Sequence, residues 1–202
     1  MVSDDFNRAD SGTLGANWTN VAGSTWGVVS NRAALGATGG FTYWNAVGFD
    51  STQSSQAVYA ETTARTYAAA ARVQSGAATG YVLYMNGPGN ALNLSKVVAG
   101  AETLLGSSIQ LGATNDVLKV DCNGTTITPT VNGAAISGLG AQTDSAITGG
   151  APGMWTDPAE SFGTGLDDWQ GTGEQNPNIL SGFNPIKAST RRPAAFSPGL
   201  AR

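Results

Sequence analysis

The groups in this sequence with the chemistry for bond cleavage are its 14 aspartates and glutamates. Hydrolysis of a glycosidic bond needs two carboxyl groups about 5 to 9.5 Å apart, one as acid and one as nucleophile or base. When both carboxyl groups of such a pair lie on a single strand, the sequence of that strand reads Glu, any residue, Asp and then, one or two residues later, Glu. No stretch of this chain has that pattern. We therefore predict that the chain is not an enzyme, and a hydrolase built from acids distant in sequence stays open as an alternative.

Two further residue types limit the chemistry, because the sequence contains no histidine and one cysteine, Cys122. The missing histidine removes Ser-His and Cys-His nucleophilic catalysis and imidazole zinc sites. A single cysteine cannot form an intrachain disulfide or a thiolate metal cluster, and we expect it to be a small buried residue on a strand. The residues thus predict no catalytic centre and no cofactor.

Aromatic side chains have a different chemical use, since a flat ring can stack on the apolar face of a sugar. The same side chains are the usual material of a β-sandwich core, and Trp26, close to Val28, is expected there. The stretch 41–44, in a glycine-rich connection, is the best exposed candidate. The candidate glycan-binding residues are Tyr43, Trp44 and Tyr84.

Charge is divided unevenly along the chain. Residues 1–170 carry thirteen acids and six bases, a net charge of −7, and residues 171–202 carry one acid and four bases, a net charge of +3, which together give −4. An acidic body disfavours nucleic acid as a partner. No apolar run of about 18 residues is present, and residues 1–6 lack the basic and apolar regions of a signal peptide. We expect neither a membrane partner nor export.

The elements that must position these residues are short strands, because apolar segments bounded by Gly and Asn recur at intervals of about ten residues. The expected strands are 26–29, 32–35, 46–49, 57–63, 80–85, 91–97, 103–105 and 116–122. A meander follows, in which Asn123-Gly124 and Asn132-Gly133 are the turns on either side of a strand over 125–131. Pro129 indicates an edge or an irregularity in that strand.

Several stretches of the body resemble concanavalin A-like, laminin-G-type jelly rolls of bacteriophage virion proteins and bacterial surface proteins. They are Asp5-Phe6-Asn7-Arg8-Ala9-Asp10 with Leu14-Gly15-Ala16-Asn17-Trp18, the meander 116–133, the segment 148–155, and Asp167-Asp168-Trp169. The resemblance covers about residues 4–170 and implies an all-β, antiparallel jelly-roll β-sandwich. It does not select a function, since this architecture carries lectins, glycanases, adhesins and virion components.

The resemblance also implies that the first and last strands lie side by side, with Phe6 near Trp169. It would bring two acidic pairs to neighbouring strands, Asp4 with Asp5 and Asp167 with Asp168. Four carboxylates that close could hold calcium, which favours several oxygen ligands. The alternative is that these residues are solvated strand ends or caps, so we predict no metal and keep calcium as the less favoured case.

The segment 171–202 is predicted to be an extended, basic arm, because it holds four prolines and no alternation long enough for a strand. It cannot bury enough apolar surface alone to offset the ordering cost of about 1 to 2 kcal/mol per residue. We therefore expect it to lie on a neighbouring subunit or partner, or else to fold back on its own acidic body. The expected anchors are Ile179, Leu180, Phe183, Ile186, Arg191, Arg192, Phe196 and Leu200.

Together these features predict a structural virion protein of a phage-like particle, made in the host cytoplasm. It would be a capsid-decorating or tail-associated subunit that is attached through the arm to copies of itself or to a major capsid or tail protein. The alternative is a lectin-like or adhesin module that binds a surface glycan through Tyr43, Trp44 or Tyr84.

Overall fold

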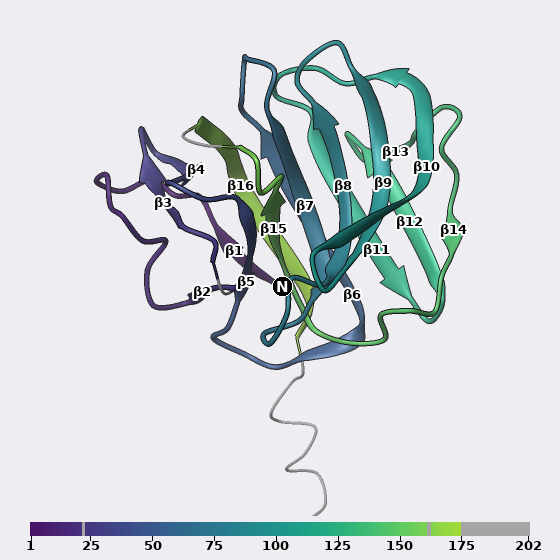
Figure 1. The fold of residues 1–202 in the computed structure, drawn as a ribbon, viewed down its shortest axis with the longest axis horizontal. Helices are drawn as coiled ribbons and strands as arrows, with labels where there is room; N and C mark the ends of the chain where they lie inside the picture. Colours follow the sequence, from purple (N-terminus) through teal and green to yellow (C-terminus); the bar gives the residue numbers. More distant parts are fainter. Residues whose placement is uncertain (22, 161–162, 175–202) are drawn as a thin grey trace, which may run out of the picture.

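The fold is an antiparallel β-sandwich of two sheets, seen in a computed structural model that describes residues 1–21, 23–160 and 163–174 (Figure 1). Sheet A contains, in spatial order, β13 (Ala134–Ala135), β12 (Thr126–Val131), β11 (Val117–Asn123), β6 (Phe49–Tyr59), β16 (Gly163–Glu174), β4 (Arg32–Leu35) and β3 (Trp26–Val29). β1 (Val2–Asp4) pairs with β16, and β14 (Gln142–Thr143) pairs with β12.

Sheet B covers the other side of the core. Its order is β10 (Ala101–Leu111), β9 (Ala91–Val98), β8 (Gly80–Asn86), β7 (Thr66–Val73), β15 (Ala151–Thr156), β5 (Gly40–Trp44) and β2 (Trp18–Asn20). Figure 1 shows β2 to β5 gathered at one side of the molecule and β9 to β14 at the opposite side. Among the described residues, no helix is long and apolar enough to cross a membrane.

The core between the sheets is rich in indole rings. Trp44 stacks on Trp169 with ring centroids 5.5 Å apart, and Trp18 meets both rings edge-on. Phe6 packs on Trp18 at 6.0 Å. The register places Asp4 of β1 opposite Trp169 of β16, which confirms that the first and last strands are neighbours.

The tight turns follow the local chemistry of their residues. Asn132 and Gly133 both have positive φ angles, as the predicted two-residue type I′ turn requires. The preceding turn differs, because Asn123 pairs with Thr126 and leaves Gly124-Thr125 as the loop. Pro129 occupies a stretch of β12 where neither β13 nor β14 pairs, so its missing N–H removes no ladder bond on that side.

Other expectations are corrected by the structure. Residues 46–48 form a turn rather than a strand, and the stretch 41–44 lies within β5 rather than in a connection. The alanine-rich run 66–73 is a strand, β7, buried on both faces. β16 continues through Glu174, so the boundary predicted between 170 and 171 lies inside a strand of the body.

Sheet B buries the middle of its outer face as well as its inner face. A second apolar cluster, distinct from the core between the sheets, includes Phe41, Val82, Tyr84 and Trp155. Trp155 is 2% exposed, with its ring 6.1 Å from Phe41 and 5.6 Å from Tyr84. This face therefore has a packed aromatic layer of its own, which we call the outer-face cluster.

Candidate functional site

Three connections and the ends of four strands line an open cavity of about 600 Å³ at one end of the sandwich, which we call the loop cavity. The β5–β6 turn, the β7–β8 loop and the segment before β15 supply its lining. The lining residues are Tyr43, Trp44, Asn45, Val47, Gly48, Phe49, Val73, Gln74, Ser75, Thr148, Gly149, Gly150 and Ala151. Its volume is within the range of about 300 to 1,000 Å³ that is typical of ligand pockets.

The wall formed by 148–150 is held in place by buried polar groups. The side-chain amide of Gln53 donates to the Gly150 carbonyl at 2.9 Å and accepts from the Arg72 backbone N–H at 3.0 Å. The guanidinium of Arg72, itself buried, donates to the carbonyls of Ile147 and Gly124. Gly150 has φ +141°, and a Cβ there would lie 2.5 Å from backbone atoms of Arg72 and Val73. The wall is thus shaped before any ligand arrives.

The lining combines rings with unused polar groups. Tyr43 and Phe49 are partly exposed, whereas the Trp44 ring is buried in the core, and its buried Nε1–H has no hydrogen-bond partner among the described residues. The side chains of Gln74, Ser75 and Thr148 are exposed and form no hydrogen bond to another described residue. The cavity can therefore offer apolar faces together with donors and acceptors.

The three predicted glycan-binding residues are not brought to one place. Tyr43 and Trp44 both line the loop cavity, although the Trp44 ring is 7% exposed and belongs to the core rather than to the exposed stretch that we expected. Tyr84 belongs to the outer-face cluster, and its hydroxyl donates to Glu102 Oε1 at 2.6 Å. Phe49, Gln74 and Thr148 were missed, because no local pattern marks them.

The four aspartates considered for calcium lie around one strand pair, as the resemblance implied, but the carboxylates of Asp4, Asp5 and Asp167 already accept hydrogen bonds from the chain. Asp4 accepts hydrogen bonds from Arg8, from Trp18 Nε1 at 2.8 Å and from its own turn at Phe6 N. Burial raises the pKa of Asp167, and Asp168 and Asp5 raise it further. Among the described residues, no group of three or more His, Cys, Asp or Glu side chains is placed to hold a metal ion.

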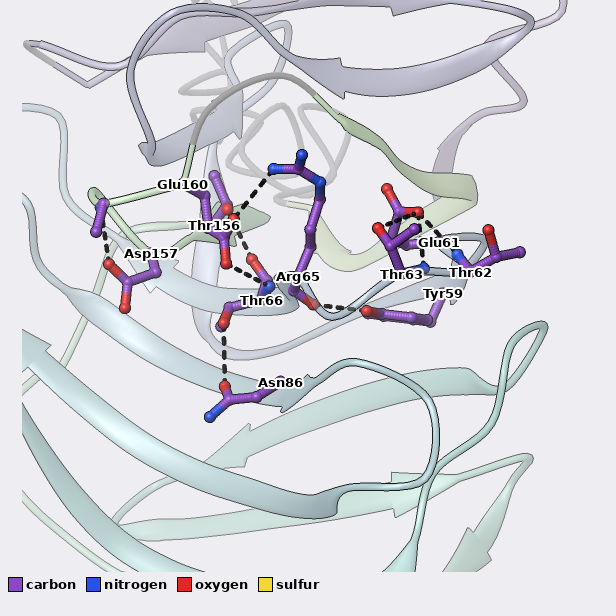
Figure 2. A network of polar contacts seen from close by, with 11 residues as sticks. Tyr59, Glu61, Thr62, Thr63, Arg65, Thr66, Asn86, Thr156, Asp157 and Glu160 are labelled. Atoms are coloured by element: carbon purple, nitrogen blue, oxygen red, sulfur yellow. Dashed lines mark hydrogen bonds and ion pairs between the residues drawn. The ribbon is translucent and has the colours of Figure 1, made fainter.

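The distant acids Glu61 and Glu160 share a polar network around Arg65 at the opposite end of sheet B (Figure 2). Glu160 pairs with Arg65 at 3.2 Å and accepts from the Thr66 backbone N–H. Glu61 accepts from the backbone and hydroxyl of its own turn at 62–63. Burial, followed by the negative charge of Glu61, raises the pKa of Tyr59 above its ordinary value. These carboxylates thus fix loops in place.

The predicted anchors of the arm are Ile179, Leu180, Phe183, Ile186, Arg191, Arg192, Phe196 and Leu200, and all of them lie outside the described residues.

No protein-family model and no sequence of a curated protein matches the chain. Solved structures match its fold. The carbohydrate-binding module CBM66 from Bacillus subtilis is 15% identical, with 78% of this chain and 94% of that chain covered and a TM-score of 0.59. The GH43 protein BlXynB from Bacillus licheniformis is also 15% identical, with a TM-score of 0.58, and the match covers 85% of this chain and 39% of that one.

A third match is the exoplasmic/lumenal domain of VIP36, solved in a form bound to Ca²⁺ and Man3GlcNAc. It is 9% identical, covers 81% of this chain and 88% of its own, and has a TM-score of 0.51. At these identities the likeness shows the fold alone. The chain has the jelly-roll β-sandwich architecture that the sequence predicted.

Proposed function

We propose that this chain is a glycan-binding module and that the loop cavity is its binding site. The observation that carries the proposal is a preformed cavity of about 600 Å³ in which partly exposed rings stand beside polar side chains without partners. Sugars present an apolar ring face and a rim of hydroxyl groups, and this lining matches both. The likeness to a carbohydrate-binding module and a lectin-type domain supports the same choice.

Each part of the cavity has a role in this function. Tyr43 and Phe49 stack on the sugar ring, and Gln74, Ser75 and Thr148 exchange hydrogen bonds with its hydroxyls. Because the wall is held by Gln53 and Arg72, little ordering free energy is spent on binding.

The prediction of a virion structural protein rests on the family resemblance, on the missing catalytic pattern and on the arm, whose anchors lie outside the described residues, and no comparison reported above supports it. The likeness to carbohydrate-binding proteins favours the glycan alternative. In this proposal the chain binds a glycan and does not cleave it. Release of reducing sugar from a bound glycan would instead assign the chain to the hydrolases.

A glycan array with the full chain tests the proposal. We expect one or more hits, loss of at least about 90% of the signal with Tyr43→Ala, and retention of most of it with Tyr43→Phe, because the ring survives. Gln74→Ala should weaken the same hits about fivefold through one lost hydrogen bond. A wild-type array without hits, or full binding by Tyr43→Ala, would contradict the proposal.

A further inference from the structure

A second, smaller cavity of about 190 Å³ lies over the outer-face cluster of sheet B. Its volume is about six times the ~30 Å³ that one water molecule takes up in the liquid, so it fits a group of only a few non-hydrogen atoms. Trp155, Val97, Ala78 and Pro158 give it an apolar wall. Glu102 of β10 and Asp157, which follows β15, also line it.

The two carboxylates have no positive partner. Neither Glu102 nor Asp157 forms an ion pair with any residue in 1–21, 23–160 or 163–174. Within the described part of the chain, the one side chain that donates a hydrogen bond to either carboxylate is Tyr84, whose neutral hydroxyl donates to Glu102. Burial, Glu102 and Asp157, in that order of effect, raise the pKa of Tyr84 to about 12, so this phenol stays neutral near pH 7 and brings no positive charge to the carboxylates. The cavity is acidic and uncompensated.

The wall that carries Glu102 is fixed by hydrogen bonds between two loops. Ala99 and Gly100 form the β9–β10 turn, both with positive φ angles. The Ala99 N–H donates to Thr79 Oγ1 at 3.0 Å, and the Gly100 N–H donates to the Ala78 carbonyl at 2.8 Å. The turn therefore has a defined position beside the cavity.

The opposite wall is fixed by the polar network of Figure 2. Asp157 accepts from the Ala159 N–H, and the Glu160 N–H donates to the Asp157 carbonyl. Arg65 and Thr66 then hold the Glu160 carboxylate. Gly39 packs so closely on this loop that a Cβ would lie 2.0 Å from the Asp157 carbonyl oxygen. Glu102, at the start of β10, and Asp157, in the loop after β15, thus both lie on segments that hydrogen bonds hold in place.

We infer that this cavity binds a small organic cation, an alkylated ammonium group, between Trp155 and the carboxylates of Glu102 and Asp157. An aromatic wall with adjacent negative charge attracts such a cation through its ring quadrupole and through Coulomb attraction. Calcium fits less well, because it takes six to eight oxygen ligands and most of this wall is carbon. A neutral sugar would leave the two charges uncompensated.

Calorimetric titration of the full chain with choline chloride tests the inference. The matched control ligand is the tert-butyl analogue of choline, in which a carbon atom replaces the nitrogen. We expect choline to bind and the neutral analogue to bind at least about tenfold more weakly, because only charge differs between them. Equal binding of the two ligands, or no heat with choline, would overturn the inference.

Substitutions of the two carboxylates test whether choline binds in this cavity. The pair Glu102→Gln and Asp157→Asn keeps side-chain size, and Asn can still accept from Ala159, so we expect choline binding about tenfold weaker in a folded protein. Asp10→Asn, which removes one negative charge at an exposed residue on the N-terminal segment, should leave it unchanged. Unchanged binding by the double variant, or tighter binding of calcium chloride than of choline, would also overturn the inference.

Discussion

The outer faces of the two sheets differ, although both sheets contribute to the same core. The outer face of sheet A carries polar pairs, such as Lys119 with Asp121 at 2.9 Å and Gln56 with Gln170 at 3.2 Å. The outer face of sheet B carries the outer-face cluster, whose aromatic and alanine side chains are buried. A sheet that is packed on one face needs only alternating apolar and polar residues along its strands. β7 is packed on both faces, so its residues are buried on both sides.

We expect this difference in composition to appear in stability as well, because solvated polar pairs contribute little to the free energy of unfolding and buried aromatic rings contribute much. The following substitutions test whether the two faces differ in energy as much as in composition.

The largest effect is expected at Trp155. Trp155→Ala removes a ring that is 2% exposed and in contact with Phe41 and Tyr84, so the free energy of unfolding should fall by about 3 to 5 kcal/mol. Lys119→Ala on sheet A is the matched comparison and should cost less than about 1 kcal/mol. Urea unfolding measures both. Equal losses would remove the contrast between the faces.

The second largest loss of stability is expected at Asp4 of β1, whose carboxylate is bonded to other side chains. Asp4→Asn breaks a bidentate contact with Arg8 and weakens the bond to Trp18 Nε1 next to the core. We expect a loss of about 2 to 3 kcal/mol in the free energy of unfolding, since hydrogen bonds to charged groups are the stronger ones. A loss within about 0.5 kcal/mol would show that this carboxylate is as dispensable as its exposed neighbours.

The stability of the protein in acid should also depend on Asp4. Burial alone raises the pKa of Asp4, but its bonds to Arg8, Trp18 and Phe6 N outweigh burial and hold that pKa below its ordinary value. A lowered folded-state pKa contributes stability above the unfolded value of about 3.9, and this is lost as the pH falls through the folded value. Urea midpoints should therefore decrease below about pH 4, and less steeply in Asp4→Asn. Parallel pH profiles of the two proteins would contradict this.

The smallest effect is expected from Gln56→Ala. Its amide donates to Gln170 Oε1 on the outer face of sheet A, where water can replace either partner. The free energy of unfolding should change by less than about 0.5 kcal/mol. A loss above about 1 kcal/mol in urea unfolding would mean that the polar face also supports the fold.

What could be predicted from the sequence depends on how local the signal is. The Asn132-Gly133 turn needs only two residues with positive φ angles, and it was found. β7 was missed, because a strand buried on both faces shows no alternation and its alanines carry little β propensity. Tyr43 and Trp44 were identified together as neighbours in sequence. Their partners in the loop cavity come from separate connections, which only the tertiary fold brings together.

The burial of Cys122 has a practical consequence for labelling. Cys122 is part of β11, and its side chain is 1% exposed. Burial raises the pKa of its thiol to about 12, so almost none of it is in the reactive thiolate form near neutral pH. A cysteine introduced at an exposed position, such as Ser75 beside the loop cavity, would then be the fast-reacting thiol among the described residues. A fluorophore could be attached there without first removing the native cysteine.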